Sequence, residues 1–143
     1  MRLLILSLII FVVAGCSKKQ LAVNKLNGEW TIVSYQQTHA NGLVFDVASE
    51  GTFAFNRYPC RKVNNGSFGY FQSCTDNNQT TTVNCTGNYS LTKNAKDINV
   101  NIIYSDGSIE PRDYSINILT TTDLKMSVTF NDLIHTYVLK KKK

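Results

Sequence analysis

Apolar and polar residues alternate along three successive segments in the second half of the chain. The pattern is clearest over residues 98–102, where Ile and Val alternate with Asn, and it recurs over 114–118 and 124–130. A period of two places successive side chains on opposite faces of a strand and does not fit a helix. Each segment therefore predicts a β-strand with one face toward a core and the other toward water.

The rest of the chain after residue 28 is rich in Thr, Tyr, Ile, Val and Phe, which favours further strands. Clusters of Asn, Asp and Gly separate the apolar stretches and are typical of tight turns. Eight strands are expected, at 29–37, 51–58, 68–74, 83–92, 97–104, 112–119, 124–130 and 134–140, with a short strand at 43–46 left open. Short connections and the advantage of removing exposed edges predict an all-β fold, a single eight-stranded antiparallel up-and-down barrel.

Residues 3–14 form one apolar run behind the single cation Arg2. A membrane-spanning helix needs roughly 20 apolar residues, so this run is too short to be one. Its length and its basic start are typical of a secretory signal peptide.

The apolar run ends in Val13-Ala14-Gly15-Cys16, which resembles the lipobox of bacterial lipoproteins. The resemblance implies cleavage before Cys16, a diacylglyceryl thioether on its sulfur and an acylated amine, with palmitate as a typical chain. Several acyl chains would give a stable anchor. The alternative is an ordinary signal peptide followed by a chance cysteine. Removal of residues 1–15 from the 143 leaves a mature chain of 128 residues.

Residues 16–25 are polar after the cysteine and lack periodicity, so we expect a tether there and one β-barrel domain over 26–143. The second mature residue is Ser17 and not Asp. By resemblance to lipoprotein sorting rules, this implies export to the outer membrane. No acidic stretch follows Cys16, which favours the leaflet that faces the periplasm.

The formal net charge of +5 lies at the two ends of the chain. Seven of the fifteen basic residues are Arg2, Lys18, Lys19 and the lysines 140–143, so the body carries eight basic and ten acidic residues. No basic stripe supports nucleic-acid binding. The lysine tail is expected either to touch anionic lipid headgroups or to form a solvated terminus. With 43% hydrophobic and 17% charged residues, the chain is not of the disordered class.

The segment from Leu26 through Gly28 and Trp30 resembles the Leu-x-Gly-x-Trp start of lipocalin-like domains. Residues 124–127 and 137–140 resemble the last two strands of small lipocalin-like lipoproteins, so the likeness covers about 27–140. It implies that Trp30 caps the core at the closed end of a barrel. The chain departs from lipocalins in the weak motif Arg112-Asp113-Tyr114, in Lys140 as the nearest late cation where lipocalins have arginine, and in having no helix after the last strand.

Alternation within a barrel predicts which side chains face inward. The inward set that we expect to bind a ligand is Phe53, Phe55, Tyr89, Ile102, Tyr104, Tyr114 and Tyr137. The remaining inward residues are Trp30, Ile32, Leu91, Ile98, Val100, Ile116, Ile118, Met126, Val128, Phe130 and Leu139. An eight-stranded barrel either fills with side chains or holds one small ligand. We therefore expect a non-catalytic lipoprotein that binds a small hydrophobic or amphipathic ligand, or alternatively a filled structural or protein-interaction barrel of the cell envelope.

Three cysteines remain besides Cys16, and an exported protein meets an oxidising compartment. A hairpin centred near Gln79 would place Cys74 opposite Cys85. This pairing predicts a disulfide worth about 3 kcal/mol. A bond from Cys60 with a shifted register is the alternative.

No pattern of catalytic residues stands out. The histidines, His39 and His135, lack a cluster of metal ligands and are expected at the surface or in loops. Carboxylates fall mostly in turns, and no nucleophile motif or phosphate-binding loop occurs. We expect no enzyme activity, no metal, no cofactor and no nucleic-acid partner, and we expect a monomer.

Overall fold

The computed structural model describes residues 20–58, 65–76, 78–92 and 94–143. The lipobox with Cys16, the first three basic residues and Cys60 therefore lie outside the described residues. The strands are β1 (Gly28–Thr38), β2 (Val44–Asp46), β3 (Ser49–Arg57), β4 (Asn65–Asp76), β5 (Gln79–Leu91), β6 (Asp97–Ile103), β7 (Ile109–Leu119), β8 (Asp123–Phe130) and β9 (Leu133–Lys141).

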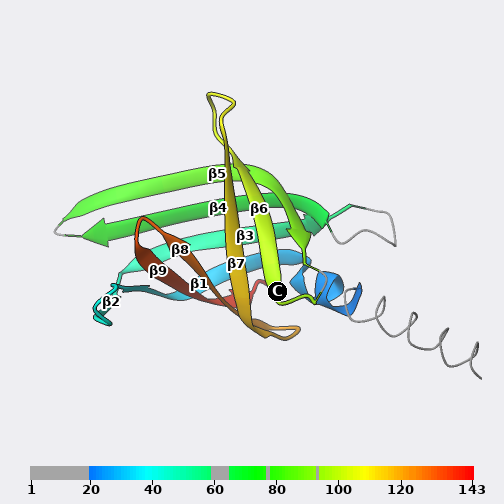
Figure 1. Cartoon of the computed structure of the whole chain (residues 1–143), viewed down its shortest axis with the longest axis horizontal. Coiled ribbons are helices and arrows are strands. Elements are labelled where there is room, and N and C mark those ends of the chain that lie inside the picture. The colour runs from blue at the N-terminus through cyan, green and yellow to red at the C-terminus, as the bar shows by residue number, and fades with distance from the viewer. Residues whose placement is uncertain (1–19, 59–64, 77, 93) are drawn as a thin grey trace, which may run out of the picture.

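The strands form one antiparallel meander that closes on itself (Figure 1). Each strand from β3 to β9 pairs with the next, β1 pairs with β3, and β1 also pairs with β9. The closed barrel thus has eight strands, β1 and β3–β9, and β2 is a short addition to the end of β1. The predicted fold class is confirmed, and the strand left open at 43–46 is β2.

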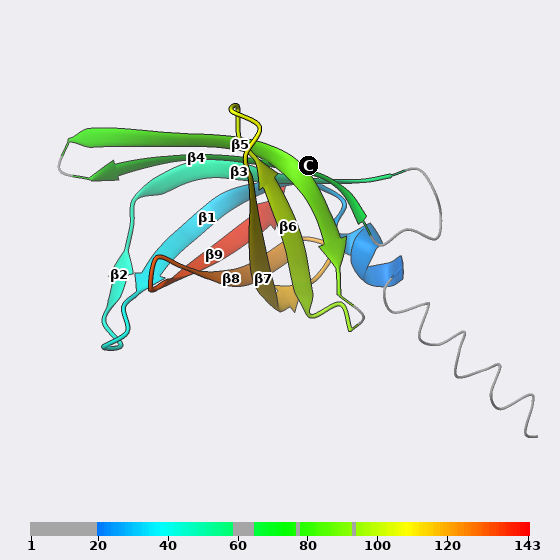
Figure 2. The ribbon, with the colours of Figure 1, turned by 45° about the horizontal axis from the view of Figure 1, so that its top comes forward.

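A helical segment at residues 20–26 lies against one end of the barrel, which we term the closed end (Figure 2). Ala22, Val23 and Leu26 from this segment are buried in the main core. The prediction of a polar tether is wrong for residues 20–25, because three apolar residues at positions 22, 23 and 26 form one helical face that the barrel buries. Among the described helical residues, none belongs to a helix long and apolar enough to cross a membrane.

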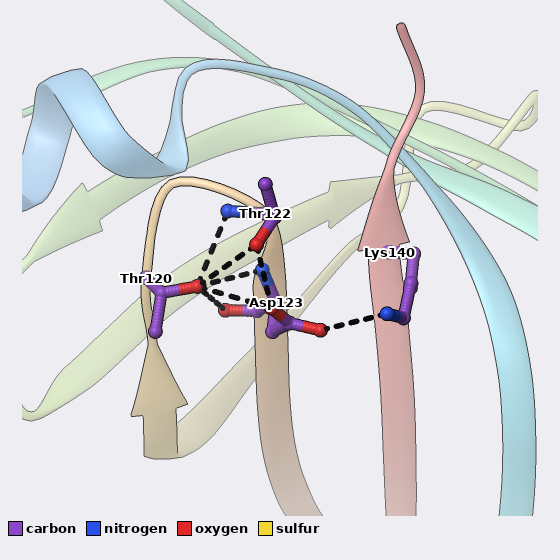
Figure 3. Close-up of polar contacts among 4 residues, drawn as sticks. All are labelled: Thr120, Thr122, Asp123 and Lys140. Carbon is purple, nitrogen blue, oxygen red and sulfur yellow. Dashed lines mark hydrogen bonds and ion pairs between the residues drawn. The ribbon is translucent and has the colours of Figure 1, made fainter.

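Tight turns connect the strands at the predicted Asn and Asp clusters. Asn131 and Asp132 both have positive φ, 50° and 61°, as a two-residue turn between β8 and β9 requires. Between β7 and β8, the Thr120 hydroxyl oxygen accepts hydrogen bonds from the backbone amides of Thr122, at 3.2 Å, and Asp123, at 2.8 Å (Figure 3). Side-chain bonds thus fix this turn at the closed end.

Two β-bulges change which residues face the core. The register shifts between Ile32 and Ser34 in β1, so that Tyr35 is buried. A second shift between Ile116 and Ile118 turns Ile118 outward, where it is 49% exposed. The prediction that Ile118 faces inward is therefore wrong, because one extra residue reverses the alternation of a strand.

Strands β4 and β5 run past the rim of the barrel at the end opposite the helical segment (Figure 2). Their hairpin pairs Asp76 with Gln79, so its turn comes two residues earlier than expected. Cys74 consequently pairs with Thr81, and Cys85 pairs with Tyr70. The predicted disulfide is wrong: Cys74 and Cys85 are free, because four residues, ~13 Å, separate their positions along the hairpin.

Candidate functional site: the mouth of the barrel

Trp30 closes the core at the helical end. It is fully buried, and its indole Nε1 donates a hydrogen bond of 2.7 Å to the Leu26 carbonyl. The Lys141 ammonium lies 5.0 Å from the centre of the indole ring. The late cation beside the tryptophan is therefore Lys141, not Lys140 as expected, because the register pairs Trp30 with Lys141.

Gly28 makes this arrangement sterically possible. Its φ is +126°, a conformation that residues with a side chain rarely adopt, and a Cβ there would lie 2.9 Å from Cε of Lys141. Gly28 and Trp30 of the predicted motif thus act together at the closed end.

The lysines that follow Leu139 are held to the barrel. Lys140 Nζ lies 3.3 Å from a carboxylate oxygen of Asp123 (Figure 3), and Lys142 Nζ lies 3.0 Å from Glu29. β9 extends one residue beyond the expected strand, to Lys141, while the Lys140 side chain is still 66% exposed to solvent.

The middle of the barrel is closed by Phe53. Its ring centroid lies 4.5 Å from that of Tyr70, 5.1 Å from that of Tyr137 and 6.2 Å from that of Tyr114. Three strands separate β3 from β7 in either direction around the barrel, so the contact with Tyr114 spans its width. The side chains buried between this level and the helical segment are Trp30, Phe55, Phe68, Tyr89, Leu91, Ile98, Leu124 and Leu139.

Tyrosines and glutamines line the wall between Phe53 and the open end, which we term the mouth. Tyr35 stacks on Tyr137 with centroids 4.9 Å apart, and the Tyr70 and Tyr137 hydroxyl oxygens are 3.5 Å apart. The Tyr70 hydroxyl donates to Gln72, whose amide donates to Ser49 at 2.7 Å. Burial raises the pKa of Tyr70 and Tyr137 well above the ordinary tyrosine range, so both stay neutral and keep their O–H donors.

An ion pair also faces the mouth. Arg112 Nε donates to Glu110 at 2.9 Å, and its guanidinium carbon lies 4.0 Å from the centre of the Phe130 ring. The Tyr104 hydroxyl donates to the other Glu110 oxygen. Burial opposes the charge on Arg112, but the hydrogen bond to Glu110, together with the electrostatic effects of Tyr114, Glu110 and Tyr104, outweighs it and raises the arginine pKa. The Arg112 side chain is only 17% exposed.

His135 joins the tyrosines at the rim, so the prediction of a surface or loop histidine is wrong for it. Its Nδ1 lies 2.6 Å from the Tyr35 hydroxyl, and its Nε2 lies 3.2 Å from the Phe130 carbonyl. Burial lowers the pKa of the imidazole, and the positive charge of Arg112 lowers it further, against the Phe130 carbonyl, which raises it. The neutral ring fits both contacts, with the Tyr35 O–H donating to Nδ1 and the Nε2–H donating to the carbonyl.

The structure places the predicted ligand-facing residues at different levels. Phe55 and Tyr89 lie between Phe53 and the helical segment, and burial raises the pKa of Tyr89 to about 12. Ile102, Tyr114 and Tyr137 are buried beside or above Phe53, whereas Tyr104 is only partly buried. The mouth residues that sequence reasoning did not find are Tyr35, Tyr70, Gln72, Glu110, Arg112 and His135. Arg112 lies two residues before Tyr114 on the same strand, so the alternation of that strand would by itself have placed Arg112 on the inner face.

A hollow of about 540 Å³ lies beside β2, between the ends of β1 and β4. Gln37 lines it and also donates a 2.8 Å hydrogen bond to the Tyr35 hydroxyl. Phe45, Val47 and Cys74 supply apolar surface. In the described parts of the chain, no group of three or more His, Cys, Asp or Glu side chains is placed to hold a metal ion. The mouth offers aromatic faces, hydroxyl and amide groups and one paired guanidinium.

The fold is similar to that of several solved structures with low sequence identity to this chain. A lipocalin-like protein from Bacteroides uniformis is 20% identical, with a TM-score of 0.50 over 82% of this chain and 99% of that one. A redesigned β-barrel is 16% identical, with a TM-score of 0.51 over 85% of this chain and 96% of its own. A protein named EF1p2_mFAP2b, solved with DFHBI bound, is 12% identical, with a TM-score of 0.54 over 86% of this chain and 98% of its own.

No curated protein sequence matches the chain. A family model does: the one described as a lipocalin-like domain matches residues 26–128. These residues run from the buried Leu26 through most of β8 and include the Gly28–Trp30 motif. The chain therefore belongs to the lipocalin-like domain family.

Proposed function

We propose that the protein is a non-catalytic binding module that holds one small amphipathic ligand in the mouth half of its barrel. One observation carries the proposal: Phe53 and the rings around it divide the interior. The closed half is packed with apolar side chains, whereas the mouth half combines aromatic faces with tyrosine hydroxyls and the Arg112–Glu110 pair. Sites with apolar walls and few polar groups are typical of small-molecule binding.

The ligand that fits has an aromatic or short aliphatic body and a polar end. Phe53 limits its depth, so a long straight hydrocarbon would not fit. The similar barrel EF1p2_mFAP2b holds DFHBI, and its fold supports a ligand in this one. A structural barrel with a fully filled interior is the competing function.

The test uses 1-anilinonaphthalene-8-sulfonate, an aromatic amphiphile that fluoresces when it is bound. We expect saturable binding to the full chain and a loss of at least about tenfold in affinity in Ile102→Phe, which adds volume to the mouth half. Ile103→Phe is the matched control, because Ile103 is the next residue of β6 and points outward, 38% exposed. It should bind the dye like the original protein.

Thermal unfolding of each variant checks that it folds. If Ile102→Phe does not fold, Val128→Phe gives a second way to fill the same half. Equal dye binding by the inner and outer variants, together with native mass spectra that show no small molecule on protein from its own source, would reject the proposal in favour of the structural barrel.

The binding module is proposed to sit in the cell envelope, anchored through lipid on Cys16 in the outer membrane and facing the periplasm. The lipobox and Ser17 support this placement. Cys16→Ala should move the protein from the membrane fraction to the soluble fraction. Unchanged fractionation would exclude the anchor without bearing on the ligand.

A further inference from the structure

A second hollow, of about 390 Å³, lies on the outer wall over β4, β5 and β6. We call it the amide groove. Its polar and aromatic lining consists of Tyr58, Asn65, Asn88, Ser90, Asn99 and Asn101. Neither the barrel interior nor the mouth includes these outward side chains.

The alternation of β5 and β6 builds the groove. Tyr89 and Val100 point inward and are buried, so Asn88 and Ser90 on β5 and Asn99 and Asn101 on β6 point outward. The register sets Asn88 directly beside Asn101, and Ser90 beside Asn99. Opposed side chains on neighbouring strands lie about 5 Å apart, so the four form one continuous polar surface.

Two of the groove's groups are already oriented. The Tyr58 hydroxyl donates a 3.0 Å hydrogen bond to Oδ1 of Asn88, which leaves the Asn88 amide hydrogens as donors. Nδ2 of Asn99 donates to Asp113 at 2.6 Å, which leaves its carbonyl oxygen as an acceptor. Asn101 makes no side-chain hydrogen bond with another residue that the structure describes. The groove thus presents donors and acceptors side by side.

A buried polar atom without a partner occurs at the same place. Oδ1 of Asn65, which lines the amide groove, is buried and has no hydrogen-bond partner among the residues that the structure describes. Unsatisfied buried polar groups are rare, and each calls for a specific reason. The Tyr89 hydroxyl lies inside the barrel, whereas Asn65 points outward beside Ser90, so its unpaired acceptor is the group that a hydroxyl-bearing ligand in the groove would satisfy.

We propose that the amide groove binds a neutral saccharide. No charged side chain lines it, and the one carboxylate bonded to its lining, that of Asp113, is held by Asn99, which favours a neutral ligand over an ion. Its amides each offer a donor and an acceptor, which suits neighbouring sugar hydroxyls. Tyr58, 45% exposed, gives an aromatic face for the C–H side of a sugar ring. The volume is near the lower end of ligand pockets, roughly 300–1,000 Å³, and fits one or two sugar units.

The test titrates the full chain with four neutral disaccharides: maltose, cellobiose, lactose and N,N′-diacetylchitobiose. Each sugar is added up to about 10 mM, so that saturation-transfer NMR and calorimetry also detect weak specific binding. We expect at least one of the four to bind, with amide shifts confined to residues around Asn88 and Asn101. Asn101→Ala and Tyr58→Ala should each weaken that binding at least about fivefold.

Asn84→Ala is the matched control, since Asn84 is an exposed residue of β5 that lies outside the groove. It should bind the sugar unchanged, as should Ile102→Phe, which alters only the barrel interior. These controls distinguish sugar binding in the amide groove from binding of the proposed ligand inside the barrel. No binding by any of the four sugars, or equal binding by Asn101→Ala, Tyr58→Ala and Asn84→Ala, would overturn the proposal.

Discussion

The Lys141 ammonium lies 5.0 Å from the centre of the Trp30 indole and donates a 2.7 Å hydrogen bond to the Lys25 carbonyl. One cation thus joins the last strand, the first strand and the end of the helical segment. Burial lowers the pKa of this ammonium. Gly28 leaves room for the Lys141 stem, which explains why the glycine and the tryptophan of the motif are found together.

Replacing Lys141 by Met should reduce the stability of the closed end. The alkyl packing stays, whereas the contact with Trp30 and the bond to the Lys25 carbonyl are lost, for a total of about 1–2 kcal/mol. Urea denaturation followed by Trp30 fluorescence measures the change. Lys143→Met, at an exposed position, should shift stability by no more than about 0.5 kcal/mol. Equal urea midpoints for the two variants would show that the contacts of Lys141 do not stabilise the closed end.

Phe53→Ala should destabilise the barrel strongly, because the Phe53 ring is fully buried and contacts aromatic rings on three other strands, β4, β7 and β9. Truncation of such a side chain costs about 3–5 kcal/mol. Phe71→Ala is the matched control on β4, where the ring points outward and is 42% exposed. Its cost in urea denaturation should be below about 1 kcal/mol. A cost for Phe53 no larger than that for Phe71 would mean that the interior is not closed at this level.

Cys74 and Cys85 should differ in their reaction with iodoacetamide under native conditions. Cys85 is buried, and burial raises its thiol pKa, so little reactive thiolate forms. Cys74 is partly exposed and should react first. Peptide mass spectrometry after timed alkylation separates the two sites. A peptide pair linked by a Cys74–Cys85 bond would contradict the register of the β4–β5 hairpin.

The sequence predicted the order, type and approximate bounds of all eight barrel strands, because period-two alternation and Asn or Asp turns are local signals. It did not predict the bulges in β1 and β7. A bulge depends on how two neighbouring strands fit together, and it reverses the facing of every later residue. Ile118 was misplaced and Tyr35 was missed for this one reason.

The sequence predicted fewer of the residues at the mouth than of the residues in the core. Arg112 was left out of the inward-facing set and His135 was expected at the surface or in a loop, because charge and polarity are the usual marks of exposure. Both side chains face inward and contact residues that are distant in the sequence. Arg112 contacts Phe130, and His135 contacts Tyr35. Cys74 and Cys85 were misjudged because the exact turn of a hairpin cannot be located among adjacent Asp, Asn and Gln residues.

Stability should fall as the pH drops below about 6.5, where an exposed histidine begins to gain a proton. Burial lowers the pKa of His135 in the folded chain, so the unfolded chain binds the proton first and gains population. The loss should level off once the pH passes the lowered folded pKa. His135→Gln should remove this slope, and His39→Gln, at an exposed position, should leave it. The urea midpoint, measured between pH 5 and 8, gives the slope of stability against pH. Equal slopes for both variants would exclude His135 as the cause.

The free edge of β5 should be visible in hydrogen exchange. β6 pairs with β5 only over residues 86–91, so residues 79–85 have β4 on one side and no described strand on the other. Every second amide of residues 79–85 then points to solvent. NMR exchange should show alternating fast and slow amides there, with rates differing at least about tenfold, and uniform protection over 86–91. This edge carries no charge and no proline, the usual guards against strand addition. Uniform protection over 79–85 would therefore mean that another strand covers the edge, and its dependence on protein concentration would tell whether that strand comes from a second copy.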